Sequence, residues 1–386
     1  MKIMKTKQLF ILLFLILAYS GYSQRTCGTL VPDMKALQKS NPVYYQNLIN
    51  IKQHVDNFDL KSSTKSYSTS GILTIPVIVH VIWHTSAENI SDAQIESQID
   101  VLNEDFRRNN PDASNTPSDF TSVASDVEIE FILSDIIRKN TTQSSFSISD
   151  ANGNGVFDLS EEQTAGIKFN TNGSAAISTD KYLNMWVCNL SGGLLGYAQF
   201  PGGESSTDGV VITFDSFGRT GTLNPPFDEG RTATHEIGHW LNLNHIWGDD
   251  GTSCFGTDNV GDTPNQAGPN YGCPSHPHLS CSSNDMFMNY MDYTDDGCMN
   301  IFTQGQKTRM HALFSSGGAR ESFTDCSNIY INNQTISTNK DIESCDDITI
   351  ENVTIENNAN VEIDAGNRIM IEKNFEVKVG STLKME

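Results

Sequence analysis

The pattern of apolar and polar residues along the chain predicts one strand, then a helix, then several further strands. Residues 73–83, LTIPVIVHVIW, predict a strand rich in β-branched side chains, in which His80 is expected to be a packed side chain. Residues 91–108 predict a helix with Ser91 as its N-cap, because apolar side chains recur there at helical spacing. Further strands are expected at 127–133, 182–190, 195–200 and 209–214. This order indicates an α/β or α+β domain.

Alternation of apolar and polar residues returns in the C-terminal part of the chain. Beyond Cys326, apolar residues occupy alternate positions and Asn, Gly and Asp stand at the turns, as in ITIENVTIENNANVEIDAGNRIMIEKNFEVKVGSTLKM. This pattern predicts short strands with little helix. We therefore expect residues 327–386 to form a small all-β module with solenoid-like turns. Such a module resembles short C-terminal β modules of secreted bacterial proteins.

The first 23 residues have the pattern of a secretory signal peptide. Lysines precede the apolar run Leu9–Leu17, and the small residues Gly21 and Ser23 predict cleavage after Ser23. The run is too short to span a membrane. Residues 24–70 are polar and weakly periodic, and the stretch KSSTKSYSTSG near their end is expected to be an exposed linker open to proteolysis.

The net charge narrows the classes of partner. The chain has 386 residues, enough for two or three domains, and 37% of them are hydrophobic. Its formal net charge of −22 argues against nucleic acid or an anionic membrane surface as a partner. The charge suits a secreted protein that binds cations, although solubility alone explains it equally well. We expect a soluble monomer without a membrane span.

One stretch, RTATHEIGHWLNLNHIWGDD at residues 231–250, has the pattern of a metal site. His235 and His239 are four residues apart, so they share one face of a helix, and Glu236 can reach a water beside them. Catalytic zinc takes three protein ligands and keeps one position open. His245 can supply the third ligand only if the chain turns sharply near Asn242.

Asn242 is a suitable residue for this turn. A residue that closes a helix in the left-handed region has a positive φ, which glycine adopts without steric cost and asparagine tolerates better than most side chains. We therefore predict a positive φ for Asn242 and a His245 ring that points back toward the other two histidines. The offsets of the three histidines, together with the export signal, favour a zinc site over coincidence.

A second stretch, MFMNYMDYTDD at residues 286–296, supports the metal site. The spacing HExxHxx(G/N)xxH followed by a methionine-containing turn is the metzincin signature. In this pattern Met291 would form the hydrophobic base beneath the imidazoles, and Tyr293 would stand near the metal. Core packing is the alternative for Met291 alone.

Four stretches resemble the pappalysin family of metzincins: TATHEIGHWLNLNHIWGD, VGDTPNQ, MNYMDYTDDGCMNIFTQGQKTRM and YLNMWVCNLSGGLLGYAQFPGG. The resemblance covers roughly residues 70–325. It implies an α+β fold, in which a twisted mixed five-stranded sheet and the active-site helix lie above a lower subdomain with the Met-turn and disulfides. Asn242 departs from the glycine that is commoner in the family.

The resemblance also implies a mechanism. Zinc held by the three histidines polarises a water, and Glu236 takes its proton as general base. The Tyr293 hydroxyl would help to stabilise the oxyanion. Residues 196–203, GYAQFPGG, would form an edge strand that pairs with an extended substrate.

Substrate preference stays open at this stage. Some relatives prefer arginine, which implies an acidic pocket. The candidate position just before Cys298 is Gly297, with Asp295 and Asp296 nearby.

Cys27 stands in RTCGT, residues 25–29, within the segment that is expected to be removed. A thiolate is a strong zinc ligand, and this stretch resembles the cysteine switch of metzincin zymogens, so Cys27 is expected to keep the enzyme latent. An unpaired or intermolecular cysteine is the alternative. Cys188 lies in an apolar strand, where a buried free thiol is expected.

Four more cysteines cluster after the histidine motif, and four cysteines allow three pairings. The resemblance implies the pairs Cys254–Cys281 and Cys273–Cys298, which would hold the loops below the site. A bridge between Cys326 and Cys345 is a conjecture.

Two loops are candidates for calcium. Residues 150–161, DANGNGVFDLSE, have the spacing of an EF-hand loop, and a surface loop rich in Asn and Gly is the alternative. The candidate ligands in this loop are Asp150, Asn152, Asn154, Val156, Asp158 and Glu161. Because the family binds calcium near its active-site loops, the stretch TDNVGDTP adds a second set, namely Asp258, the Val260 carbonyl and Thr263.

These predictions combine into one organisation of the chain: a signal peptide at 1–23, a propeptide with a cysteine switch at 24–70, a metzincin domain at 71–326 and a β module at 327–386. The predicted function is a secreted zinc-dependent endopeptidase, made as a latent zymogen, that acts on proteins or peptides. A catalytically inactive binding or adhesive protein of the same fold is the alternative, and the intact Glu236 argues against it. The expected edge strand disfavours a zinc hydrolase of non-peptide substrates.

Overall fold

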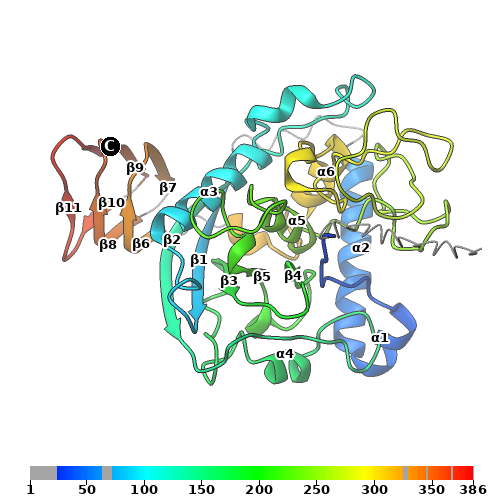
Figure 1. The fold of residues 1–386 in the computed structure, drawn as a ribbon, viewed down its shortest axis with the longest axis horizontal. Helices are drawn as coiled ribbons and strands as arrows, with labels where there is room; N and C mark the ends of the chain where they lie inside the picture. The colour runs from blue at the N-terminus through cyan, green and yellow to red at the C-terminus, as the bar shows by residue number, and fades with distance from the viewer. Residues whose placement is uncertain (1–23, 63–71, 325–328, 345–346, 367, 386) are drawn as a thin grey trace, which may run out of the picture.

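A mixed five-stranded sheet forms the centre of the larger part of the fold (Figure 1). The computed structural model describes residues 24–62, 72–324, 329–344, 347–366 and 368–385. The edge strand β4 runs antiparallel to β5, and the other neighbouring strands are parallel. The predicted mixed sheet is therefore confirmed. Its order is β2-β1-β3-β5-β4, with β1 (Leu73–Trp83), β2 (Ile129–Asn140), β3 (Leu183–Cys188), β4 (Gly196–Ala198) and β5 (Val210–Thr213).

The strands inside the sheet are buried on both faces, which explains their nearly continuous apolar runs. Strand β2 corrects the sequence prediction, because it begins at Ile129 and continues beyond residue 133 to Asn140. Its register shifts opposite Val77 and Ile78. A bulge breaks the alternation of apolar and polar positions without ending the strand, so the pattern alone ended too early.

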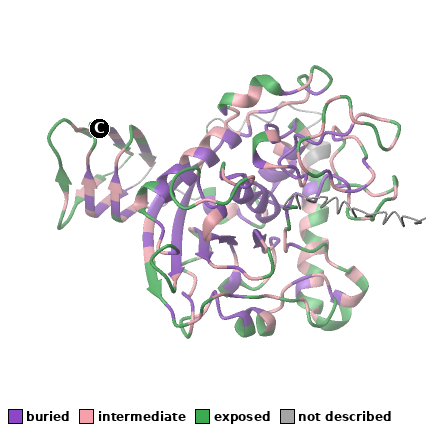
Figure 2. Cartoon of the chain, in the orientation of Figure 1, coloured by how far each residue is buried: buried purple, intermediate pink, exposed green. Residues whose placement is uncertain are grey.

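Helix α3 (Asp92–Phe106) packs against β2 and against α5 (Arg231–Trp240), the helix of the histidine motif. The Ser91 hydroxyl accepts a hydrogen bond from Gln94 N at 3.2 Å, which confirms the predicted N-cap. The helix ends two residues before the predicted position, because Arg108 has a φ of 49°. Buried residues concentrate in the sheet and in α5 (Figure 2).

The N-terminal segment forms two helices that its weak periodicity did not predict, α1 (Met34–Ser40) and α2 (Pro42–Ser62). The Asp33 carboxylate caps α1, and Pro42 begins α2. Helix α2 lies beside α6 (Gln304–Ala312) in Figure 1. It buries a narrow stripe that includes Val55, so most of its surface is polar and the amphipathic signal is weak.

The C-terminal module consists of parallel strands stacked in successive turns, as the predicted solenoid-like pattern requires. One stack joins β6 (Ile329–Ile336), β8 (Asp347–Ile355), β10 (Arg368–Ile371) and β11 (Glu376–Val377), and the other joins β7 (Lys340–Ser344), β9 (Asn360–Ala365) and β12 (Thr382–Met385). Isoleucines stack in register inside it, since Ile329 pairs with Ile348, and Ile348 pairs with Ile369. The first turn packs on β2, where Gln334 donates to the Leu133 carbonyl at 2.9 Å.

Three predictions lie outside the described residues: the signal peptide at 1–23, most of the linker at 61–71, and the conjectured Cys326–Cys345 bridge. Among the residues that the structure does describe, no helix is both long and apolar enough to cross a membrane.

Candidate active site

Helix α5 places His235 and His239 on one face and then stops at a left-handed residue. Asn242 has a φ of 70°, as predicted. Its amide donates to the His239 carbonyl at 2.8 Å, and the Leu243 amide donates to the Gly238 carbonyl at 2.9 Å. These two bonds form a Schellman motif with asparagine at the position that usually holds glycine. The chain leaves the helix axis there and returns toward the cleft.

The return brings three imidazole nitrogens to one point. The distance from His239 Nε2 to His235 Nε2 is 3.2 Å, and that to His245 Nε2 is 3.1 Å. Nitrogens bound at about 2.0–2.1 Å to a tetrahedral ion lie about 3.3 Å apart, so this spacing suits zinc. The predicted orientation of His245 is therefore present.

Each of the three rings has a partner at its other nitrogen. Backbone carbonyls serve two of them: His235 Nδ1 lies 2.7 Å from the Tyr290 oxygen, and His239 Nδ1 lies 2.8 Å from the Leu243 oxygen. A carboxylate serves the third, because His245 Nδ1 lies 2.8 Å from Asp249 Oδ1. Acceptors at Nδ1 favour the tautomer that leaves Nε2 free for a metal. Burial and the neighbouring imidazoles lower the pKa of His235 and of His239 well below its ordinary value, which keeps these rings neutral.

The turn with Met291 lies against the same helix. Met291 is fully buried, and a side chain at Gly238 would overlap its sulfur, so the turn packs directly on α5. The Ile246 amide donates to the Met291 carbonyl at 3.2 Å and ties this turn to the loop that carries His245. The structure thus places Met291 where the sequence pattern expected the hydrophobic base.

Tyr293 stands at the edge of the histidine cluster. Its ring centroid lies 4.9 Å from that of His245 and 5.7 Å from that of His235. Burial, followed by the nearby Cys27 and Glu236, raises the pKa of the Tyr293 phenol above its usual value. The hydroxyl therefore remains protonated and can donate a hydrogen bond within the cleft.

Glu236 is buried beside the metal-ligand candidates. Burial raises the pKa of its carboxyl to about 7, while hydrogen bonds from Thr29 and Cys27 lower it. Gly196 of β4 packs against its side chain, where a Cβ would lie 3.0 Å from Glu236 Cγ. The carboxylate thus faces the space between α5 and the edge strand.

Residues 25–29 fill the cleft as an extended strand. Gly28 N donates to the Gly196 carbonyl at 2.8 Å, and Leu195 N donates to the Thr26 carbonyl at 3.0 Å, in a parallel arrangement. The Cys27 sulfur joins the three histidine nitrogens in a group whose ligand atoms all lie within 4.8 Å of one another. Strand β4 is therefore an edge that accepts a further chain, and the occupant in this structure is the N-terminal segment.

Two contacts of this segment were missed by the sequence analysis. Thr29 Oγ1 donates to Glu236 Oε2 at 2.8 Å and accepts from Ala198 N at 2.8 Å. Thr29 is two residues from Cys27, so in an extended chain both side chains point to the same face. This alternation of side chains in RTCGT was the sequence feature from which the Thr29 contact could have been predicted.

The second missed contact is that of Arg25, which lies in an acidic pocket. The guanidinium forms an ion pair with Asp296 and donates to the Thr294 carbonyl at 3.1 Å and to Thr232 Oγ1 at 3.2 Å. Its charge also lies 5.1 Å from the Phe227 ring centroid. The acidic side chain of the pocket is thus Asp296, one residue before the candidate position Gly297.

The cysteines match the pairing that the resemblance implied. Cys254 bonds to Cys281, and Cys273 bonds to Cys298. Cys27 and Cys188 are free thiols, and Cys188 is buried as predicted. Both bridges hold the loops that follow His245 and flank the turn with Met291.

Neither calcium candidate gathers three acidic side chains at one point. In the first loop, Glu161 accepts from Ala151 N at 2.6 Å and from Asp158 N at 2.9 Å, and so caps α4 (Leu159–Ala165). In the second, Asp258 accepts from Thr263 Oγ1 at 2.8 Å. Within the described ranges, the one group of three or more His, Cys, Asp or Glu side chains close enough to hold a metal is Cys27 with the three histidines. Calcium stays a prediction.

Known proteins share both the sequence and the fold. Residues 172–315 match the Peptidase_M43 family, described as Pregnancy-associated plasma protein-A. An extracellular metalloprotease from Arthroderma benhamiae is 31% identical over 295 residues, which cover 75% of this chain and 89% of that protein.

Two solved structures from Tannerella forsythia are similar over most of the fold. A promirolysin mutant has a TM-score of 0.68 and 46% identity and covers 78% of this chain and 97% of its own. Mature mirolysin in complex with a cleaved peptide has a TM-score of 0.61 and 50% identity and covers 67% of this chain and 97% of its own. By its sequence, its mixed sheet and its histidine motif with the Met-turn, the chain belongs to the pappalysin family of metzincin metalloproteases.

Proposed function

We propose that this metalloprotease is a secreted zinc-dependent endopeptidase that is made as a latent zymogen. The observation that carries the proposal is the meeting of three imidazoles, in which His239 Nε2 lies 3.1–3.2 Å from the other two Nε2 atoms, beside Glu236 and an edge strand that already binds an extended segment. The extracellular relatives support secretion.

The side chains of the cleft then have separate roles. His235, His239 and His245 would hold zinc, which would supply Lewis acidity toward a water and the scissile carbonyl. Glu236 takes the proton of the water and passes it to the leaving amine. Tyr293 donates its hydroxyl hydrogen to the developing oxyanion.

Strand β4 and the acidic pocket select the substrate. An extended peptide pairs with the free edge of β4 through backbone hydrogen bonds, as residues 25–29 do here. Asp296 lies fully buried at the end of the pocket, so it favours a lysine or arginine side chain of the substrate. The substrate class is therefore protein or peptide with a basic residue beside the scissile bond.

Latency follows from the same contacts. Cys27 occupies the open metal position, Thr29 engages the general base, and Arg25 fills the pocket. The match to promirolysin covers more of this chain than the match to mature mirolysin, which supports a removable propeptide at 24–70 after a signal peptide at 1–23. The metzincin domain at 71–326 and the β module at 327–386 complete the proposed organisation.

Calcium is part of this proposal as a structural ion of the loop at 150–161. This loop also contacts the propeptide: Asp33 N donates to the Asn154 carbonyl at 2.9 Å, and Asn41 Nδ2 donates to Asp158 Oδ1 at 2.9 Å. Calcium that rigidifies the loop would therefore stabilise the docked propeptide. We expect the thermal midpoint of the zymogen to rise with added calcium, and to respond less in Asp150→Asn.

A digestion assay tests the proposed activity. The matured protein should cleave casein, and o-phenanthroline should abolish the cleavage because it removes the metal. Glu236→Ala should reduce the rate by at least about 10³-fold, whereas the exposed Glu204→Ala should behave as wild type. Equal behaviour of wild type and Glu236→Ala would instead support an inactive binding protein.

A further inference from the structure

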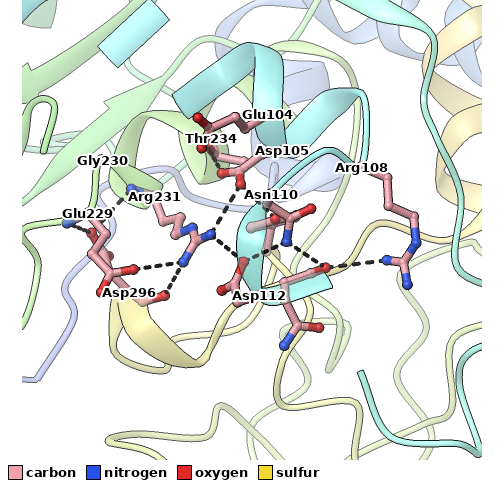
Figure 3. A network of polar contacts seen from close by, with 12 residues as sticks. Glu104, Asp105, Arg108, Asn110, Asp112, Glu229, Gly230, Arg231, Thr234 and Asp296 are labelled. Carbon is pink, nitrogen blue, oxygen red and sulfur yellow. Dashed lines mark hydrogen bonds and ion pairs between the residues drawn. The ribbon is translucent and has the colours of Figure 1, made fainter. Parts of the chain in front are cut away.

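Arg231, the first residue of α5, lies at the centre of a buried polar network (Figure 3). Its side chain is almost fully buried, and acidic groups surround the guanidinium. Nη2 donates to Asp112 Oδ1 at 2.9 Å and to Asp105 Oδ1 at 3.4 Å, while Nη1 donates to Glu229 Oε2 at 2.9 Å. These contacts use the planar fork of arginine, which a lysine cannot reproduce.

The network reaches the acidic pocket through Asp296. Arg231 contacts this residue twice: its Nη1 donates to the Asp296 backbone carbonyl at 3.1 Å, and its backbone amide donates to Asp296 Oδ2 at 3.2 Å. The Glu229 amide adds a third bond to the same Oδ2 at 2.9 Å. One oxygen of the carboxylate is therefore held by the start of α5, and Oδ1 is left to face the pocket, where Arg25 binds it.

Removal of the propeptide would leave this oxygen without Arg25. Asp296 has no solvent exposure in the structure, so a substrate cation is the natural replacement for the lost partner. The direction in which Oδ1 points then depends on how firmly the short helix η4 (Asp296–Cys298) is held. The last residue of η4, Cys298, is fixed by a disulfide, and Arg231 holds the first residue, Asp296, through its backbone carbonyl.

We propose that Arg231 is a positioning residue for substrate specificity: it aligns Asp296 so that the pocket binds a basic side chain. The Arg231 side chain donates to Glu229, Asp105, Asp112 and the Asp296 carbonyl, and, among the described residues, it has no hydrogen bond to the metal-ligand candidates or to the segment in the cleft. It acts through Asp296. The proposal rests on the proposed peptidase function and on the pocket that Arg25 occupies.

A purely structural role would have a different signature. Loss of packing between α3, α5 and η4 would lower kcat/KM for all substrates alike. Loss of alignment at Asp296 would lower kcat/KM only for substrates with a basic residue in the pocket, mainly through KM, because the carboxylate binds the side chain in both the ground state and the transition state.

The first experiment compares two fluorogenic peptides that differ in one residue, arginine or norleucine, at the pocket position. In Arg231→Lys, which keeps the charge and is expected to fold, the preference for arginine should fall about 10-fold or more, while kcat/KM for the norleucine peptide stays within about 3-fold. The control Arg219→Lys changes an arginine that pairs with Glu104 on the surface and should leave the preference unchanged. An equal loss on both peptides, or an unchanged preference, would overturn the proposal.

The second experiment needs no activity. In the full-length Glu236→Ala zymogen, Arg25→Met should lower the thermal midpoint, and it should do so by less than about half as much when Arg231→Lys is also present. Additive effects of the two substitutions would refute the proposal. If wild type cleaves no peptide at all, the proposed function fails, and this cycle still decides whether Arg231 supports the pocket.

Discussion

At the scale of single residues, Asn242 forms the turn that connects helix α5 to the third histidine, His245. It adopts a φ of 70°, which costs most residues other than glycine about 1–2 kcal/mol and asparagine less. Its buried Nδ2 has no hydrogen-bond partner in the structure, so a glycine there would lose no bond. The side chain is tolerated at the turn rather than required by it.

Substitutions at this position should therefore have opposite effects. We expect Asn242→Gly to keep activity within about 2-fold and to stabilise the fold by up to about 1 kcal/mol. Asn242→Val should destabilise it and weaken metal retention, because a β-branched side chain strains the turn that delivers His245. Thermal unfolding and zinc content after dialysis against a chelator measure both effects. Equal metal retention in the two variants would contradict this role.

Thr29 is the second residue whose effect can be isolated. Its hydroxyl donates to Glu236 at 2.8 Å, and a bond to a charged group contributes about 1.5–3 kcal/mol. Thr29→Val keeps the shape and removes both this bond and the one from Ala198 N, so the zymogen should activate about 10-fold faster or more. Thr29→Ser should stay close to wild type. The measurement is the time course of propeptide loss on a gel. Similar rates of propeptide loss in Thr29→Val and Thr29→Ser would show that this hydrogen bond does not maintain latency.

At the scale of elements, strand β1 contains a histidine that should make stability depend on pH. His80 is fully buried, with Nδ1 2.8 Å from Ser174 Oγ and Nε2 2.9 Å from Asn184 Oδ1. Its ring stacks on Trp186. Burial lowers the pKa of His80 to about 4. The predicted role of a packed strand histidine agrees with this environment.

The direction of the pH effect follows from the lowered pKa. Below pH 6.5 the unfolded chain binds a proton that the folded chain excludes, so stability is full above about pH 6.5 and declines as the pH falls toward 4. The loss amounts to about 3 kcal/mol at most. In His80→Gln the fall in thermal midpoint between pH 7 and pH 4.5 should be smaller than in wild type. A fall of the same size would exclude His80 as the cause.

The elements also show where sequence patterns are informative. Helix α3 and the strands near the sheet centre were predictable because their apolar positions follow one local period. The strand predicted in place of β2 was too short because a bulge interrupts the alternation of apolar and polar residues. Helices α1 and α2 were not predicted because most of their surface faces solvent. These helices are stabilised by contacts with residues far along the chain. One example is the hydrogen bond between His54 of α2 and the Ala312 carbonyl at 3.0 Å.

At the scale of the whole molecule, the β module and the cleft lie at opposite edges of the sheet. The module packs on β2, while β4 borders the cleft (Figure 1). Ile132 of β2 belongs to the hydrophobic core of the module. Loss of the module would therefore uncover an apolar edge without touching the three histidines or Glu236.

A truncation after residue 326 should separate stability from activity. We expect a lower thermal midpoint, because Ile132 and the Leu133 carbonyl lose their partners. The kcat/KM for a short peptide should stay within about 3-fold of wild type at 25 °C, since the described residues of the truncated region pack on β2 and α3, away from the cleft. A parallel fall in kcat/KM, measured on protein that is still folded by circular dichroism, would show that the module also supports catalysis.

The sequence by itself determined the local chemistry of this protein: two histidines one helical turn apart, a glutamate between them, a residue able to end the helix in the left-handed region, and a third histidine beyond it. These features depend on neighbours within a few residues. The tertiary structure alone decided that Thr29 meets Glu236 and that Arg25 meets Asp296, partners 207 and 271 residues apart. Such pairs form because burial of separate segments brings them together, and no periodicity along the chain encodes that meeting.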